Sequence, residues 1–197
     1  MTWAQIRWYL RALPGKRSGA MHVQKISVTT WRDGVLARLG HDLEIEWGAA
    51  SCEVICTEPK AADLKFNVPT GNVAKIASRK PSLLSKPLTS SDVDEIRTRI
   101  ATTLKADTHP TLFVEVKGVP AAPPWPASLQ VPLQVSIAGQ TQSISAQFKS
   151  QSGRGWVNFS IDMRAFQLPP VTALMGAIKL KPTVDVVVEV VLGGSLL

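Results

Sequence analysis

The stretch Asp42-Leu43-Glu44-Ile45-Glu46-Trp47 decides the fold, because apolar and acidic residues alternate along it. Successive side chains of a β-strand point to opposite faces, so Leu43, Ile45 and Trp47 share one face and three carboxylates share the other. A strand of this kind is typical of an antiparallel sheet with one buried face and one face in water. The strands of a parallel sheet would be continuously apolar, and only residues 184–192 come close to that pattern.

The same alternation recurs over most of the chain. Strand candidates lie near residues 23–31, 42–49, 52–57, 63–69, 111–118, 129–137, 142–149, 156–163 and 184–192. Glycine-containing turns at Ala138-Gly139-Gln140-Thr141 and Ser152-Gly153-Arg154-Gly155 join neighbouring candidates as hairpins. The pattern predicts an all-β antiparallel barrel or sandwich, and 197 residues suit one domain with one core.

One segment breaks this pattern with helical spacing, and it predicts an amphipathic helix at about residues 92–106. Its apolar stripe consists of Val93, Ile96, Ile100 and Leu104. Ser91 is the expected N-cap, and Glu95 with Arg99 forms an i,i+4 pair. One helix cannot cover both faces of a sheet, but it can lie over a barrel or close its mouth.

The net charge of +7 is concentrated near the N-terminus. Six basic residues precede the first acidic residue, Asp33; they are Arg7, Arg11, Lys16, Arg17, Lys25 and Arg32. Of the 22 basic residues, 16 remain to set against 15 acidic ones, so the rest of the chain has a net charge of +1. We therefore expect no nucleic-acid partner, although Arg79, Lys80 and Lys86 form a local basic patch.

Residues 1–20 are expected to be a basic N-terminal extension, followed by the barrel domain over residues 21–197. Apolar residues at helical spacing favour an interfacial helix that contacts a membrane through residues 1–13. The alternatives are a disordered extension and a start codon upstream of Met21. Arg7 and Arg11 interrupt the apolar run, so we expect no secretory signal and a cytoplasmic location.

The two cysteines, Cys52 and Cys56, lie four residues apart in one predicted strand. The rise of a strand separates them by roughly 13 Å, which is too far for a disulfide between them. No second cluster of ligands completes a zinc site. We interpret both cysteines as small buried hydrophobic residues and expect no metal.

His41 and Asp42 are the one adjacent pair that suggests chemistry, because a carboxylate can orient an imidazole. Neighbours in a strand point to opposite faces, however, so His41 is expected to be a hydrogen-bonded structural residue after Gly40. The serines lie in no G-x-S-x-G context, and no glycine loop for phosphate is found. The sequence therefore predicts no catalytic residues and no cofactor.

Four segments in register resemble the YceI-like family. They are Trp31-Arg32-Asp33-Gly34-Val35-Leu36, Gly40-His41-Asp42-Leu43, the run from Leu104 to Phe113, and Met175-Gly176-Ala177-Ile178-Lys179-Leu180. The resemblance extends from about Val23 to Leu192 and implies an eight-stranded, lipocalin-like antiparallel barrel with a helix. It also implies an elongated interior that holds a polyisoprenoid or an isoprenoid quinone. Many members are periplasmic, which is the alternative location; this chain has the Gly-His-Asp-Leu form of the motif.

Inward-facing apolar residues would line such an interior. The predicted ligand-binding residues are Leu43, Ile45, Trp47, Phe66, Val114, Val116, Leu133, Val135, Phe148, Phe159 and Ile161. Val186 and Val188 share this parity. A barrel of about eight strands can be filled by side chains or hold one small ligand, and the residues alone leave both interiors open. The resemblance favours the cavity.

Three functions follow from these features. The preferred one is non-enzymatic binding, transport or storage of an apolar isoprenoid-like lipid, because the inward faces lack paired carboxylates or convergent His and Asp. The second is a hydrolytic enzyme that uses His41 and Asp42, with His109 as a third candidate. The third is a protein-interaction domain acting through the proline loop around Trp125. A homodimer is an alternative oligomeric state.

Overall fold

The computed structural model describes residues 16–17, 21–48, 50–58, 61–79, 86–120, 124–173 and 177–192. The strands are β1 (Lys16–Arg17), β2 (Met21–Thr30), β3 (Arg32–Asp33), β4 (Leu43–Trp47), β5 (Ser51–Glu58), β6 (Ala61–Pro69), β7 (Val73–Ser78), β8 (Thr111–Pro120), β9 (Ser128–Ile137), β10 (Gln140–Gln151), β11 (Arg154–Asp162), β12 (Thr172–Ala173), β13 (Ile178–Leu180) and β14 (Thr183–Leu192). The helix is α2 (Ser90–Thr103), and two short 3₁₀ turns are η1 (Ala37–Leu39) and η2 (Met163–Phe166).

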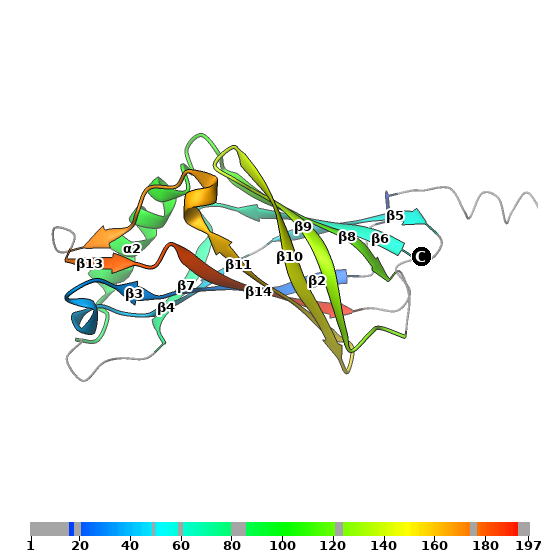
Figure 1. Ribbon diagram of the computed structural model, residues 1–197, viewed down its shortest axis with the longest axis horizontal. Coiled ribbons are helices and arrows are strands. Elements are labelled where there is room, and N and C mark those ends of the chain that lie inside the picture. Colours follow the sequence, from blue (N-terminus) through cyan, green and yellow to red (C-terminus); the bar gives the residue numbers. More distant parts are fainter. Residues whose placement is uncertain are drawn as a thin grey trace, which may run out of the picture.

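The strands form one large and one small antiparallel sheet. The large sheet has eleven strands in the order β1-β5-β6-β8-β9-β10-β11-β14-β2-β4-β7, and the small one has the order β12-β13-β3. The large sheet curls into a half-barrel, with its inner face buried (Figure 1). Over the described residues no ladder joins β7 to β1, so hydrogen bonds do not close the curl.

The predicted fold class is confirmed, and all nine predicted strands are present. The large sheet has eleven strands rather than the eight that the resemblance implied, and β7 and the short strands β1, β3, β12 and β13 are not among the nine candidates. In β7 only Ile76 is buried, so the strand lacks the alternation that would mark it in the sequence. Strands of two or three residues are too short to show an alternation in the sequence, and only their pairing identifies them. For example, β3 pairs with β13 through Asp33 and Lys179.

The helix begins two residues earlier than predicted, and its N-cap is Thr89 rather than Ser91. The Thr89 hydroxyl accepts a hydrogen bond from the Asp92 amide at 3.2 Å, and the Asp92 carboxylate accepts one from the Thr89 amide at 2.8 Å. Both Thr89 and Ser91 precede an aspartate by three residues, so the spacing of this capping box did not decide between them. The helix ends before Lys105, which has a φ of +54°.

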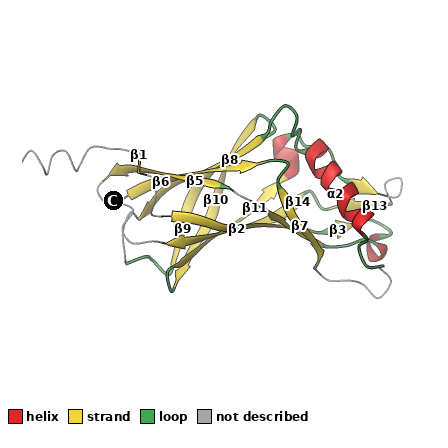
Figure 2. Ribbon diagram, turned by 180° about the vertical axis from the view of Figure 1, so that it is seen from behind, coloured by secondary structure: helices red, strands yellow, loops and turns green. Residues whose placement is uncertain are grey.

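The apolar stripe of α2 faces the sheet. Val93, Ile96 and Ile100 pack against a cluster of Leu43 and Ile45 from β4 and Ile76 from β7. The predicted Glu95–Arg99 pair is confirmed, with 2.7 Å between Oε1 and Nη2. The helix consequently lies across one end of the curled sheet (Figure 2).

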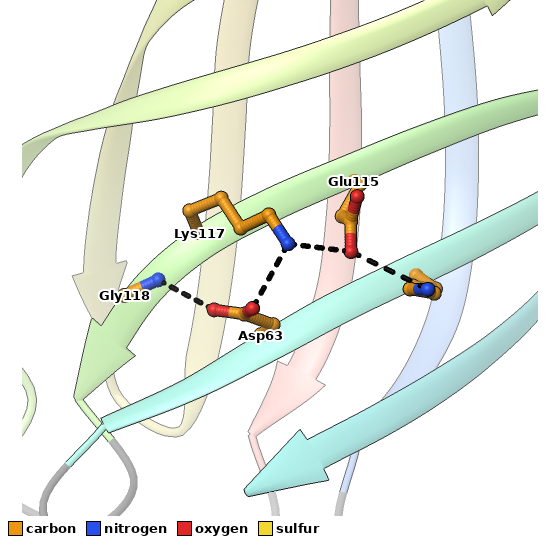
Figure 3. Close-up of polar contacts among 5 residues, drawn as sticks. Asp63, Glu115, Lys117 and Gly118 are labelled. Atoms are coloured by element: carbon orange, nitrogen blue, oxygen red, sulfur yellow. Dashed lines mark hydrogen bonds and ion pairs between the residues drawn. The ribbon is translucent and has the colours of Figure 1, made fainter. Parts of the chain in front are cut away.

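A charged network holds β6 and β8 in register on the outer face of the sheet (Figure 3). The Asp63 carboxylate accepts hydrogen bonds from the Gly118 amide at 3.0 Å and from Lys117 Nζ at 3.1 Å, beside a register shift in the ladder. Lys117 also donates to Glu115 at 2.7 Å, and Lys65 Nζ lies 3.5 Å from the same carboxylate. The Lys117 hydrogen bond lowers the pKa of Glu115.

Part of the predicted N-terminal extension belongs to the sheet. In β1, Lys16 lies opposite Ile55 and Arg17 lies opposite Val54 of β5. The predicted interfacial helix over residues 1–13 lies outside the described residues. Within the described part of the chain, no helix has the length and apolar character needed to cross a membrane.

Cys52 fits its interpretation as a small hydrophobic residue. It is a free, half-buried cysteine that packs against the main core. Burial raises the pKa of its thiol to about 12, so the thiol is protonated at neutral pH and is a poor nucleophile. The side chain of Cys56 lies outside the described residues.

Candidate functional site

The half of the barrel that contains α2 has a cavity of about 810 Å³. Its lining comes from the inner face of the large sheet, from α2, from the small sheet and from the η1 loop. The lining is mainly aliphatic and aromatic. A volume of this size is in the range of cavities that enclose small-molecule ligands.

Eight of the eleven predicted ligand-binding residues line this cavity. They are Leu43, Ile45, Trp47, Phe66, Val114, Val135, Phe159 and Ile161. Val186, Val188 and His41 line it as well. The inward parity read from the sequence thus identified part of the wall.

The other three residues, Val116, Leu133 and Phe148, do not line the cavity. They are buried in the main core and at most 1% exposed. Parity identifies the face on which a side chain lies, but not its position along the strand. All three side chains lie outside the cavity, where the interior is filled.

Several long strands run from a hollow end to a packed end. On β14, Val184, Val186 and Val188 line the cavity, whereas Val190 and Leu192 are buried in solid packing. We call the half that contains α2 and the cavity the helix end. The packed end is the half formed by Leu64, Val116, Val119, Val131, Leu133, Phe148, Val157 and Val190.

A close approach at Gly155 helps to fill the packed end. A Cβ atom on Gly155 would lie 2.9 Å from the Phe148 ring and 3.1 Å from a Val190 methyl group. The missing side chain therefore makes room for the ring across the β10–β11 pair. Phe148 and its neighbours form a floor beneath the cavity.

Several lining residues were missed from the sequence. Ile96 and Ile100 reach the cavity from α2, and Ile26, Val28 and Thr30 reach it from β2. The signals were available in the apolar stripe of the helix and in the alternation along β2. They were not combined because the sequence does not state which end of the barrel the helix covers.

Charged side chains gather at the mouth, where Lys86, Asp92, Glu95, Arg99 and Lys179 border the cavity and are exposed. The Arg99 guanidinium already has two partners within the protein. It forms an ion pair with Glu95 and donates a hydrogen bond from Nη1 to the Thr172 carbonyl at 2.8 Å. Lys86 and Lys179 make no ion pair within the described residues. The cavity thus has an apolar interior and a polar rim.

His41 and Asp42 take separate positions, as their opposite parity predicted. His41 lines the cavity, with Nδ1 3.1 Å from the Ser78 hydroxyl. The Asp42 carboxylate accepts a hydrogen bond from the Arg32 amide at 2.9 Å and lies 3.7 Å from Arg32 Nε. Asp42 therefore anchors the loop between β3 and β4 instead of orienting the imidazole.

The third candidate of the hydrolytic alternative, His109, packs elsewhere. A Cβ atom on Gly139 would lie 3.0 Å from its ring, which places the ring against the β9–β10 turn and not among the cavity-lining side chains. His41, Asp42 and His109 thus do not converge on one site. Across the described ranges, no group of three His, Cys, Asp or Glu side chains could hold a metal ion.

Trp125, in the proline loop, is half-buried and packs against the main core. Part of the Trp125 ring is therefore already in contact with the core of the domain. Pro123 of the same loop lies outside the described residues, as does Lys80 of the predicted basic patch.

The segments that suggested a family meet at the mouth of the cavity. Asp33 of the first segment pairs with Lys179 of the last, and the Leu36 amide donates to the Ala177 carbonyl at 3.1 Å. Gly34 has a φ of +95°, which permits this close approach. Met175 and Gly176 lie outside the described residues.

No protein-family model matches the chain, and no curated protein matches it. Solved structures do. BcnA from Burkholderia cenocepacia is 13% identical, with a TM-score of 0.57 over 86% of this chain and 99% of BcnA. A polyisoprenoid-binding domain from Saccharophagus degradans, implicated in plant cell wall breakdown, is 8% identical, with a TM-score of 0.51 over 88% of this chain and 98% of that domain.

At this level of identity the likeness concerns the fold. Both structures align over nearly their whole length and over most of this chain. The chain has the fold of a polyisoprenoid-binding domain, which is the fold that the resemblance to the YceI-like family implied.

Proposed function

We propose that this protein binds an apolar, isoprenoid-like lipid in the helix-end cavity and carries or stores it without covalent chemistry. The observation that carries the proposal is an apolar cavity of about 810 Å³ above a solid floor. The fold shared with a polyisoprenoid-binding domain supports the same class of ligand.

The volume sets the length of chain that the cavity can enclose. At about 30 Å³ for a water-sized group, the cavity holds on the order of 25 methyl- or methylene-sized groups. Twenty buried groups would gain on the order of 16 kcal/mol, which exceeds association costs of about 4–15 kcal/mol. Affinity should therefore rise with chain length and level off near 25 carbons.

The arrangement of polar groups favours binding over turnover. Asp42 is engaged with Arg32, and Arg99 with Glu95 and Thr172. Of the groups in the hydrolytic alternative, His41 is the one that lines the cavity, and its Nδ1 contacts Ser78. A hydrolytic site needs a positioned base together with a nucleophile or an activated water.

The proposal is tested by the lipid content of gently purified protein. Extraction with organic solvent followed by mass spectrometry should recover a long apolar molecule in near-stoichiometric amount. Added prenols of 10 to 30 carbons should displace an environment-sensitive dye, with affinity that increases along the series.

A matched pair of variants identifies the cavity as the site. Val28 lines the cavity, whereas Val191 lies on the neighbouring strand β14 with 40% of its surface exposed. Val28→Trp should weaken lipid retention and prenol binding by occupying part of the cavity, and Val191→Trp should leave both unchanged. Lipid-free preparations that bind no prenol would overturn the proposal, and turnover abolished by His41→Ala would replace it with the hydrolytic alternative.

A further inference from the structure

Among the described residues that line the cavity, Thr30 is the one with a buried hydroxyl group. Thr30 is the last residue of β2, lines the cavity and is 5% exposed. Its Oγ1 has no hydrogen-bond partner among the described residues. Buried polar groups in folded proteins are nearly always hydrogen-bonded, so each exception needs an explanation.

The neighbouring threonine shows how such a hydroxyl is normally satisfied. Thr29 faces the other side of β2, and its Oγ1 accepts a hydrogen bond from Arg79 Nη1 at 3.2 Å. The Arg79 guanidinium also lies over the Trp31 ring, 5.5 Å from its centroid. Both interactions of Arg79 lie on the outer face of β2, so Arg79 does not form a hydrogen bond with Thr30.

A second polar group lies on the same wall. Thr30 is directly opposite Leu43 in the β2–β4 ladder, and His41 precedes Leu43 by two residues and also lines the cavity. Both side chains therefore face the same cavity. The His41 Nδ1 contact with Ser78 leaves Nε2 without a hydrogen-bond partner among the described residues.

We propose that Thr30 is a head-group site, where its hydroxyl donates a hydrogen bond to a neutral oxygen of the lipid. The ligand class is a long-chain prenol, ketone or quinone, with His41 Nε2 as a second hydrogen-bonding group. The oxygen lies beside Thr30, and the chain runs toward Phe159 and Val188. This assignment rests on the proposed lipid-binding function and specifies its ligand.

The surroundings of Thr30 require the oxygen to be neutral. The cations that line the cavity, Lys86, Arg99 and Lys179, are exposed at the mouth. A diphosphate or carboxylate drawn inside to Thr30 would lose its hydration without gaining a buried partner charge. A hydroxyl or carbonyl oxygen needs only the hydrogen bond that Thr30 can provide.

The test compares two probes that differ by one oxygen. Geranylgeraniol and the hydrocarbon with a methyl group in place of its hydroxymethyl group are titrated into the full-length protein and its variants. Thr30→Val keeps the branched shape and removes the hydroxyl, so geranylgeraniol should bind about fivefold more weakly, as expected for one net hydrogen bond. The hydrocarbon should bind equally well or slightly more tightly, and Thr30→Ser should restore geranylgeraniol binding to within about twofold of wild type.

The outcomes separate this assignment from the proposed function. If both probes bind wild-type protein and Thr30→Val changes their affinities equally, the Thr30 hydroxyl forms its hydrogen bond with water and not with the lipid. The head-group site is then overturned, and the proposed lipid binding stands. If geranylgeranyl diphosphate binds more tightly than the alcohol and loses more affinity in Thr30→Val, the assignment of a neutral oxygen is overturned. If neither probe binds wild-type protein, both proposals fail. Thermal melting of Thr30→Val and Thr30→Ser checks that all proteins compared are folded.

Discussion

At the packed end of the half-barrel Phe148 is 1% exposed and rests against Gly155, whereas at the helix end Phe159 faces open space with 7% of its surface exposed. The two residues have the same inward parity and lie on adjacent strands, β10 and β11. Alternation therefore determines which side chains are inside the sheet. It does not determine whether the inside is filled.

The two ends are also closed in different ways. At the packed end β5 lies beside β2, so strand faces strand and the inward side chains meet. At the helix end β4 pairs with Ile26–Thr30 of β2 on one side and with β7 on the other, and α2 spans the opening through Val93, Ile96 and Ile100. A helix about 10 Å across keeps the walls apart, and the cavity lies beneath it.

The largest expected effect is on stability at the packed end. Phe148→Ala should lower the free energy of unfolding by about 3–5 kcal/mol, because it opens a hole in solid packing. Phe159→Ala should cost less, roughly 1–3 kcal/mol, because that ring already borders a cavity. Urea unfolding of lipid-free protein measures both. Equal losses would show that the two ends do not differ in packing.

The closure of the helix end is tested next. Ile100 packs on the β4–β7 cluster and lines the cavity, so Ile100→Asp should lower the free energy of unfolding by about 2–4 kcal/mol and abolish prenol binding. Thr98→Asp changes an exposed position on the same helix and should cost less than about 1 kcal/mol. A near-neutral Ile100→Asp would mean that α2 does not seal the cavity.

A smaller effect is expected when side chains are enlarged. Val131→Trp adds volume to the packed end and should cost about 1–3 kcal/mol. Val28→Trp adds the same volume at the helix end, where space is available, and should leave the melting temperature nearly unchanged or higher. Differential scanning calorimetry of lipid-free proteins distinguishes the two, and a large loss for Val28→Trp would contradict a hollow helix end.

The smallest effect concerns the charges over the packed end. The Lys117 hydrogen bond lowers the pKa of Glu115, and hydrogen bonds to Glu115 and Asp63 raise the pKa of Lys117. The pair therefore stabilises the fold between the ordinary pKa values of 4.5 and 10.5. Lys117→Met should cost at most about 1 kcal/mol at pH 7, as for other partly exposed pairs.

Below pH 4.5 this cost should shrink as Glu115 is protonated in both proteins, because a lowered carboxyl pKa stabilises only while the group is ionised. Urea unfolding at pH 7 and pH 3 measures the change. Prenol affinity serves as the control and should be the same in both proteins, because the network lies on the outer face. A cost that stays constant with pH would assign the effect to packing of the Lys117 stem.

The fold could be predicted because alternation such as that of Leu43, Ile45 and Trp47 marks half-buried strands over most of the chain. The site could be predicted only in part. Phe66 and Phe148 carry the same signal, and which of them borders a cavity depends on the distance of each from α2. That distance follows from strand register and helix docking, which are tertiary properties.

Thr30 shows a further limit of the sequence. A threonine at the end of an alternating strand looks like an ordinary strand residue, and nothing in its neighbours indicates that its hydroxyl is buried without a partner. His41 was noticed for its neighbour Asp42, whereas the structure connects it with Ser78 and with the cavity. The polar groups of the site come from burial and orientation more than from motifs.

The central claim is that the helix end, and not the packed end, holds the lipid chain. A crystal structure of the protein with bound geranylgeraniol tests it most directly. We expect continuous ligand density beneath α2 between Val28, Val114 and Phe159, with Phe148 and Leu133 unmoved below it. Density between the side chains of the packed end, or only on the outer surface of the sheet, would contradict the account.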